Sequence, residues 1–255
     1  MITIADAVLH AFDHRTPMAP ITDSDPGFDL AKAYAAQAEL TMARKRRGAR
    51  VVGMKTGFTN RTIWDEYNVH APIHGPVFDT TWRKGPIAAD DFIEPKIEPE
   101  ICLRLGASPH PGMDRAALMS CVDGIARVFE IVDSPFPLWR FRAPDTVAAG
   151  ALHGALVSGD FIDATPEALT ALATLDVRLI RDGETMDHGH ASNVLGGGPL
   201  AALADLVEQR GEDLLPAGWI ISTGTLTRAL PIAQGESWTT IIEGLDLPPL
   251  TLQIT

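Results

Sequence analysis

The segment KIEPEICLRLG, Lys96 to Gly106, joins an apolar pattern to two carboxylates. Its apolar side chains predict a β-strand; they are Ile97, Ile101, Leu103 and Leu105. Side chains alternate between the two faces of a strand, so Glu98 and Glu100 project from the same face. Two carboxylates this close repel each other, and burying an unpaired charge is unfavourable. The pair therefore needs either solvent or a positive partner.

A third carboxylate, Glu130, lies in a second apolar segment, IARVFEIVD, between Phe129 and Ile131. If the two strands are neighbours, three carboxylates meet on one face and can hold a hard divalent cation such as Mg²⁺ or Mn²⁺. The alternative is that Glu98 and Glu100 line a solvated face of a half-exposed strand. Spacing alone favours that second interpretation, and both stay open at this point.

Composition and charge limit the classes of function. The chain has 255 residues, of which 45% are hydrophobic and 21% charged, and a net charge of −12. These values are typical of a soluble globular protein, and the acidic charge argues against nucleic acid or an anionic membrane as partner. The N-terminal residues have no basic segment and no long apolar run, so we expect neither a signal peptide nor a membrane span, and a cytoplasmic location.

The order of predicted elements suggests two parts. A helix is predicted at about Ile4 to His14, and a second, longer helix begins near Asp29. From Ile93 onward the signals are largely those of strands, including a hairpin around Asp182 and Gly183. We therefore predict a small, mostly helical region over residues 1–80 and a β-rich domain with the carboxylates over residues 81–255.

Two further segments carry candidate site residues. In GMKTGFT, Lys55 lies between Gly53 and Gly57, directly after a predicted strand, and could offer a cation or a proton-transferring amine to a substrate. A surface lysine in a glycine turn is the equally good alternative. The segment STGTLTRA contains Thr225 and Thr227, whose hydroxyls could bind a substrate oxyanion or could belong to a turn.

Taken together, the segments resemble the 2-keto-4-pentenoate (2-hydroxypenta-2,4-dienoate) hydratase branch of the fumarylacetoacetate hydrolase superfamily. The resemblance covers most of the chain in the same order, and it rests on the segments PITDSDPGFDLAKAYAAQAE, RVVGMKTGFTN, APIHGPVFDTTW, KIEPEICLRLG, VFEIVDS, VLGGGPLAALADL and ISTGTLTRALPIAQGE. In the second of these, Phe58 and Asn60 replace the Leu and Ser of the G-x-K-x-G-L-T-S motif. An ordered set of motifs is more specific than any one of them.

The resemblance implies a fold, a metal centre and site residues. The fold class would be α+β, with a small N-terminal α/β region and a mixed β-sandwich or roll domain. Metal ligands would be Glu98, Glu100 and Glu130, holding Mg²⁺ or Mn²⁺. Lys55 and Asp79 match positions implicated in substrate binding and proton transfer. Relatives form homo-oligomers, and we expect the same here.

One segment departs from the family pattern. Where the hydratases read D-x-x-x-D-N-A-S, this chain has DTVAAGALHG, residues 145–154. Ala149, Gly150 and Leu152 replace the polar Asp, Asn and Ser, and His153 is new. His153 is a candidate catalytic residue that could take over a proton transfer, or it could be a packed histidine; the sequence favours neither.

The activity implied is metal-dependent addition of water to a 2-hydroxy-2,4-dienoate, giving a 4-hydroxy-2-oxo acid, in the catabolism of aromatic-type compounds. One alternative is decarboxylation of a 2-oxo-3-enedioate of the 4-oxalocrotonate type. Another is hydrolytic C–C cleavage of an acylpyruvate, although the His/Glu pair expected of those hydrolases is not found. A third is a partner subunit without activity, against which the intact E-x-E and third Glu argue.

Overall fold

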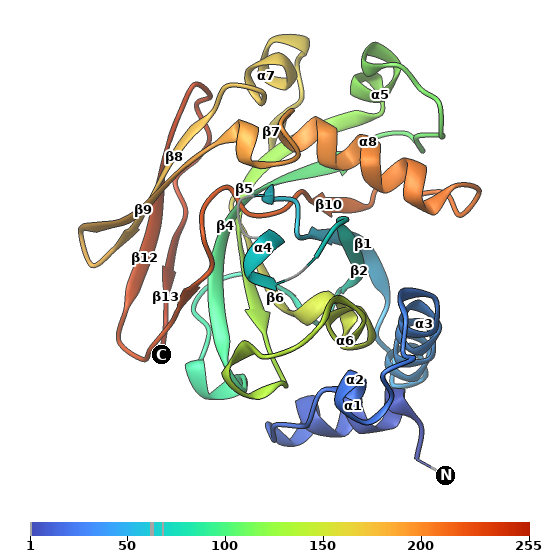
Figure 1. Cartoon of the computed structure of the whole chain (residues 1–255). Coiled ribbons are helices and arrows are strands. Elements are labelled where there is room, and N and C mark those ends of the chain that lie inside the picture. Colours follow the sequence, from blue (N-terminus) through green and yellow to red (C-terminus); the bar gives the residue numbers. More distant parts are fainter. Residues whose placement is uncertain (1, 62–63, 68) are drawn as a thin grey trace.

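Strands β4 (Pro95–Leu105) and β5 (Val122–Asp133) form a long antiparallel pair in the middle of the molecule (Figure 1). β4 is the strand predicted from KIEPEICLRLG. Its odd-numbered apolar side chains are fully buried; they are Ile97, Ile101, Leu103 and Leu105. Because side chains alternate along a strand, the odd-numbered face of β4 belongs to the core and the even-numbered face carries Glu98 and Glu100.

The computed structural model describes residues 2–61, 64–67 and 69–255. The helices are α1 (Ile4–His14), α2 (Ile21–Ser24), α3 (Leu30–Arg46), α4 (Trp64–Tyr67), α5 (Arg115–Ser120), α6 (Ala143–Ala148), α7 (Pro166–Ala171) and α8 (Pro199–Arg210). The strands other than β4 and β5 are β1 (Val51–Gly57), β2 (Ile73–Phe78), β3 (Trp82–Arg83), β6 (His153–Ser158), β7 (Ile162–Asp163), β8 (Asp176–Arg181), β9 (Glu184–His190), β10 (Ile220–Ser222), β11 (Leu230–Pro231), β12 (Ser237–Glu243) and β13 (Thr251–Gln253).

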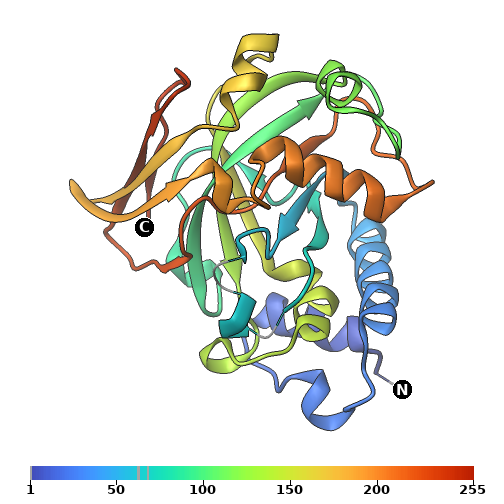
Figure 2. The ribbon, with the colours of Figure 1, turned by 45° about the horizontal axis from the view of Figure 1, so that its top comes forward.

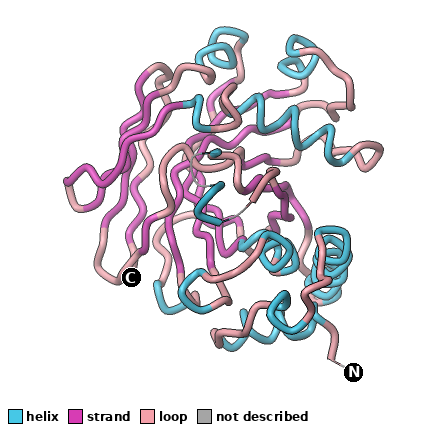
Figure 3. The backbone as a smooth tube through the Cα atoms, viewed as in Figure 1, coloured by secondary structure: helices cyan, strands magenta, loops and turns pink. Residues whose placement is uncertain are grey.

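The strands form two sheets. The nine-stranded mixed sheet has the order β2-β1-β10-β4-β5-β6-β3, with β11 paired to β4 and β7 to β5. The four-stranded antiparallel sheet has the order β13-β12-β8-β9 and includes the predicted hairpin at Asp182 and Gly183. Strands fill the centre and left of the molecule in Figure 3, and helices lie at its lower right, at its top and, as α8, across its right side. The predicted α+β class with a mixed sheet domain is confirmed.

Two apolar clusters cover the odd-numbered face of β4. Toward one end, Leu103 packs with Leu203 and Leu206 of α8, the orange helix of Figure 1. Toward the other end, Ile97 packs with Trp238 of β12, so the smaller sheet covers this part of the larger one. Burial of each such side chain contributes roughly 1.5–3 kcal/mol to the free energy of unfolding. β4 is thus fixed from one side, which sets the direction of the carboxylates on the other.

The N-terminal helices pack against one another at one edge of the molecule, as Figure 2 shows for α1 and α3. The predicted helix near Asp29 is α3, and the Asp29 side chain caps it by accepting a hydrogen bond from the Lys32 backbone N–H at 2.9 Å. Leu9 of α1 and Leu40 of α3 share a cluster with Leu152, which follows α6. The helices therefore support the segment of the chain that departs from the family motif.

The predicted division near residue 80 stays a prediction. β1 and β2 precede that position and belong to the same nine-stranded sheet as β4 and β5. In the described part of the chain, none of the helices combines the length and the apolar character needed to cross a membrane.

Candidate active site

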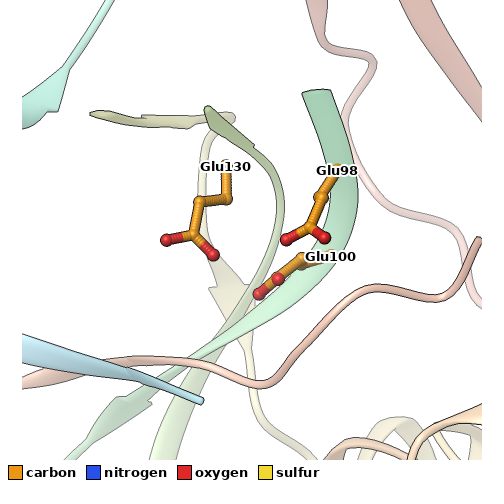
Figure 4. Close-up of side chains that lie close together, drawn as sticks. All are labelled: Glu98, Glu100 and Glu130. Carbon is orange, nitrogen blue, oxygen red and sulfur yellow. The ribbon is translucent and has the colours of Figure 1, made fainter. Parts of the chain in front are cut away.

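Glu98, Glu100 and Glu130 meet on one face of the β4–β5 pair. Glu98 and Glu100 are two residues apart on β4, and Glu130 of β5 lies directly opposite Glu98. One carboxylate oxygen of each residue lies within 4.8 Å of those of the other two, and Figure 4 shows the three side chains turned toward a common space. Glu100 and Glu130 are buried, at 1% and 0% exposure, and Glu98 is half-buried. The interpretation as a solvated face is therefore wrong.

Lys55 of β1 supplies the nearest positive charge. Its Nζ lies 3.1 Å from Oε2 of Glu130 and donates a hydrogen bond to the Ala151 carbonyl oxygen at 3.1 Å. Since Lys55 is only 2% exposed, the alternative of a surface lysine is wrong as well. Three ionised carboxylates and one ammonium leave a net charge of −2, which is the charge that one divalent cation neutralises.

Glu100 is held by the segment that follows β10. Ser222 Oγ and the Gly224 backbone N–H both donate to Glu100 Oε2, at 2.6 and 2.9 Å. Gly224 has φ +93°, and a Cβ there would lie 1.8 Å from Thr59 Oγ1, so only glycine fits. Oε1 of Glu100 is buried and has no hydrogen-bond partner among the described residues. An oxygen in that state is a ready ligand for a cation.

Glu130 is held on its other side by His153. His153 Nδ1 lies 2.8 Å from Glu130 Oε1, and His153 Nε2 lies 2.9 Å from Thr81 Oγ1. Oε2 of Glu130 has the Lys55 ion pair and no further hydrogen bond among the described residues. Glu100 therefore has one oxygen tied to the protein and one without a partner among the described residues, whereas both oxygens of Glu130 contact protein groups, Oε2 only through the Lys55 ion pair.

The pKa values reflect the crowding of charge. Burial raises the pKa of Glu98 to about 7, against the attraction of Lys55. Burial also raises the pKa of Glu100 well above its usual value, and the neighbouring Glu130 and Glu98 add to the shift. For Glu130, burial opposes ionisation, but Lys55 and the His153 hydrogen bond outweigh it and the pKa is lowered. Without a cation, protons therefore take over part of the neutralisation.

These residues fit a hard divalent cation. The donor set is three carboxylates, the chemistry that Mg²⁺ and Mn²⁺ prefer, and it includes Oε1 of Glu100, which is buried and has no partner in the described part of the chain. A tetrahedral thiolate site is a poor match, because neither of the described cysteines, Cys102 and Cys121, belongs to the group of residues whose ligand atoms meet. Glu98, Glu100 and Glu130 are thus the residues that would hold the metal.

A cavity of about 250 Å³ opens beside this cluster. Lys55 and Glu98 line it and connect it to the carboxylates. Much of the remaining wall is apolar; it includes Phe58, Ile73, Val132, Trp139, Phe141, Leu152 and Leu230. A cavity with one ionic end and apolar walls suits a small acid with a hydrocarbon chain.

The other predicted site residues are divided between the cavity and its surroundings. Thr225 lines the cavity, although its hydroxyl donates to the Thr227 carbonyl oxygen at 2.9 Å. Thr227 is buried and its hydroxyl donates to the Arg228 carbonyl oxygen, outside the cavity lining. Asp79 lies at the end of β2 and is partly exposed, where its carboxylate accepts from the Arg50 backbone N–H and Nε, both at 2.9 Å. The structure therefore does not bring Asp79 or Thr227 to the cluster.

Sequence reasoning missed the residues that hold the carboxylates. The STG segment drew notice for its hydroxyls, but Ser222 and Gly224 serve Glu100 rather than a substrate oxyanion. Thr81, which contacts His153, had no local signal at all. The Ala151 carbonyl oxygen that receives Lys55 is a backbone group, and side-chain patterns say nothing about it.

Known proteins resemble this chain over nearly its whole length. It is 32% identical to 2-hydroxyhexa-2,4-dienoate hydratase of Comamonas testosteroni, covering 89% of this chain and 88% of that one. It is 34% identical to 2-keto-4-pentenoate hydratase 2 of Dechloromonas aromatica, covering 90% and 88%. The chain belongs to the 2-keto-4-pentenoate hydratase family. No protein-family model matches the sequence.

The family also includes decarboxylases. The chain is 31% identical to 4-oxalocrotonate decarboxylase of Pseudomonas sp. strain CF600, covering 88% of this chain and 86% of that one. The solved structure of 4-oxalocrotonate decarboxylase from Pseudomonas putida G7, complexed with magnesium and adipate, superposes with a TM-score of 0.91 at 29% identity, covering 99% and 96%. Other solved structures with the same fold include members of the fumarylacetoacetate hydrolase superfamily. The resemblance seen in the motifs is confirmed.

Glu98→Gln should remove metal binding without unfolding the protein. The change deletes one ligand charge and leaves the Lys55–Glu130 pair intact. Loss of an outer-shell partner already lowers metal affinity about 10–100-fold, so we expect loss of a ligand to lower Mn²⁺ affinity by more than about 100-fold in calorimetry. Glu184→Gln, at an exposed position of β9, is the matched control. Wild-type affinity in Glu98→Gln would contradict the ligand assignment.

Metal affinity should rise with pH between about pH 6 and 8. The pKa of Glu98 is raised to about 7, so near neutrality a proton competes with the cation and binding must release it. Titration of the metal-free protein with Mn²⁺ in two buffers of different ionisation enthalpy measures the release directly. A heat of binding that is the same in both buffers, with affinity independent of pH, would refute this account.

Proposed function

We propose that this chain is a metal-dependent hydro-lyase that adds water to a 2-hydroxy-2,4-dienoate and yields a 4-hydroxy-2-oxo acid. The observation that carries the proposal is the buried set of three carboxylates beside Lys55, at the edge of a largely apolar cavity. The dienoate hydratases among the relatives support the same reaction. The apolar wall would receive the hydrocarbon part of the substrate.

The cation in this proposal is Mg²⁺ or Mn²⁺, held by Glu98, Glu100 and Glu130. When bound, it supplies Lewis acidity that binds an anionic 2-oxo acid and favours enolate character. Relatives with solved structures were complexed with magnesium, calcium or, in a more distant case, Mn²⁺.

Lys55 is the residue we assign to hydrogen bonding and proton donation. Burial opposes its charge, but Glu130, Glu98 and Glu100 outweigh that effect and raise its pKa, so the amine is an ammonium at neutral pH. Two of its three N–H groups have partners among the described residues, Glu130 and the Ala151 carbonyl oxygen, which leaves one for a ligand in the cavity. The dienol must gain a proton at C5 and release the proton of its 2-hydroxyl, which gives a 2-oxo-3-enoate, before water adds its hydroxyl at C4 and its proton at C3. A buried ammonium suits the first of these transfers.

We also propose a cytoplasmic location and a homo-oligomeric assembly. The location is supported by the similarity to hydratases of small-molecule substrates. The assembly is supported by the resemblance to the hydratase family, whose members form homo-oligomers.

The second candidate function is decarboxylation of a 2-oxo-3-enedioate. Besides Lys55, two cationic residues line the cavity, Lys96 and Arg228. The Lys96 Nζ lies 3.9 Å from the centre of the Trp139 ring, and Arg228 pairs with Asp187 at 3.2 Å. A substrate with a second carboxylate would find opposite charge there, whereas a simple dienoate would not need it. Relatives named 4-oxalocrotonate decarboxylase support this second activity, just as the relatives named hydratase support the first.

Ultraviolet absorbance with Mg²⁺ present tests the first candidate. With 2-hydroxypenta-2,4-dienoate, the absorbance of the conjugated dienoate should fall while no CO₂ is evolved. Lys55→Gln should lower kcat/KM by about 10²–10⁴-fold, the usual contribution of a positioned proton donor. Lys84→Gln, an exposed lysine paired with Asp160, is the matched control. Unchanged absorbance of the dienoate, with CO₂ released from an oxalocrotonate-type diacid, would replace the first candidate by the second.

Arg228→Gln separates substrates with one and two carboxylates. A charge-assisted hydrogen bond contributes about 1.5–3 kcal/mol, so the variant should raise KM for an enedioate by about 10–100-fold. KM for a monocarboxylate dienoate should not change. Arg178→Gln, a partly exposed arginine paired with Glu243 on the smaller sheet, is the control. Equal effects on both substrates would show that Arg228 does not read the second carboxylate.

A further inference from the structure

His153 faces Glu130 because of a β-bulge. β5 and β6 pair with Ile131 opposite Ala155 and Val132 opposite His153, so Gly154 is the extra residue. In an antiparallel pair, opposite residues share a face, and Val132 shares the face of Glu130. Without the bulge, Val132 would lie opposite Gly154, and His153 would point to the other side of the sheet. The bulge therefore aims the imidazole at the carboxylate.

Glycine at position 154 permits the bulge. A Cβ there would lie 2.9 Å from the Ile131 carbonyl oxygen and 3.0 Å from Phe92 Cε1. Both atoms belong to packed parts of the protein, so a side chain would need the strands to separate. Gly154 thus allows the backbone conformation of the bulge, and that conformation directs the side chain of His153 toward Glu130.

Both ring nitrogens of His153 are occupied. An ionised carboxylate only accepts, so Nδ1 carries the hydrogen that goes to Glu130 Oε1 at 2.8 Å. Nε2 then accepts from the Thr81 hydroxyl at 2.9 Å. The Phe78 carbonyl oxygen, 3.1 Å from the hydroxyl, is a second acceptor within its reach, but it already receives the Thr81 backbone N–H at 3.0 Å, so we assign the hydroxyl hydrogen to Nε2. Glu130 and Thr81 together therefore favour the tautomer with its hydrogen on Nδ1.

His153 lies behind Glu130 rather than in the substrate cavity. It is 6% exposed and does not belong to the described residues that line the cavity, although its neighbours Ala151 and Leu152 do. Neither nitrogen reaches a substrate from this position. The predicted proton-transfer role has no support in this geometry.

We propose that His153, held by Thr81, is a positioning residue of the metal centre, whose Nδ1–H fixes Oε1 of Glu130 so that Oε2, the oxygen paired with Lys55, is the one available to the cation. Such outer contacts set the orientation and basicity of a ligand. The arrangement belongs to the segment of residues 145–154 that departs from the hydratase motif. The inference rests on the metal centre and is independent of which reaction follows.

Two substitutions of His153 test the proposal by Mn²⁺ affinity of the metal-free protein, measured by calorimetry. His153→Asn places an amide N–H near the position of Nδ1 and should bind Mn²⁺ with close to wild-type affinity. His153→Gln places its amide near Nε2, leaves Glu130 Oε1 without a donor, and should lower affinity about 10–100-fold. Wild-type affinity in His153→Gln, or an equal loss in both variants, would overturn the proposal.

Thr81 provides an independent pair of variants if His153→Gln fails to fold, which its melting temperature without metal reports. Thr81→Ser keeps the hydroxyl and should leave Mn²⁺ affinity unchanged. Thr81→Val keeps the volume, removes the donor to Nε2 and should weaken binding. Equal affinities in the two Thr81 variants would count against the proposal. These tests measure Mn²⁺ affinity and melting temperature, not turnover. Failure of the hydratase assay would therefore not affect their outcome.

Discussion

Glu98, Glu100 and Glu130 repel one another with oxygens within 4.8 Å, in a part of the sheet largely closed to water. Such a group persists in a folded protein only when opposite charge and hydrogen bonds offset the repulsion and the loss of hydration. Lys55, Ser222 and Gly224 supply part of that compensation, from strands that lie far apart in the sequence. The strand order β1-β10-β4-β5 brings these residues together. The charge balance of the site therefore depends on the topology of the sheet.

One face of β4 contributes to the stability of the fold, and the other face carries the carboxylates of the site. The odd-numbered residues pack under α8 and the smaller sheet, while the even-numbered carboxylates face the cavity side. A slip of one residue in the β4–β5 register would exchange the two sets and bury the apolar face against the wrong partners. The apolar core on the odd-numbered face therefore fixes the direction of the carboxylates.

The parts of the site that depend on local order could be predicted from the sequence. Alternation along a strand places Glu98 and Glu100 together, and the flanking apolar residues mark Glu130 as unusual. The match of Glu98 to Glu130 depends on the pairing of two strands separated by a helix, which spacing does not determine. The family resemblance named the three carboxylates that the structure brings together, and it also named Asp79, which pairs with Arg50 just after β2. The direction of His153 depends on a one-residue bulge, and no pattern in the sequence announces it.

Backbone strain gathers around the same cavity. Phe58, Trp139, Ala151 and Leu152 all have positive φ, between 54° and 58°, and all four line it. A residue with a Cβ loses roughly 1–2 kcal/mol in this region of φ and ψ. At Ala151 the reason is visible, because the left-handed turn before β6 directs its carbonyl oxygen to Lys55. Gly75 makes room for that turn, since a Cβ there would lie 2.5 Å from the Gly150 carbonyl oxygen. The fold thus gives up some stability where a backbone group must hold the ammonium against the carboxylates, as expected of a site shaped for binding rather than for packing.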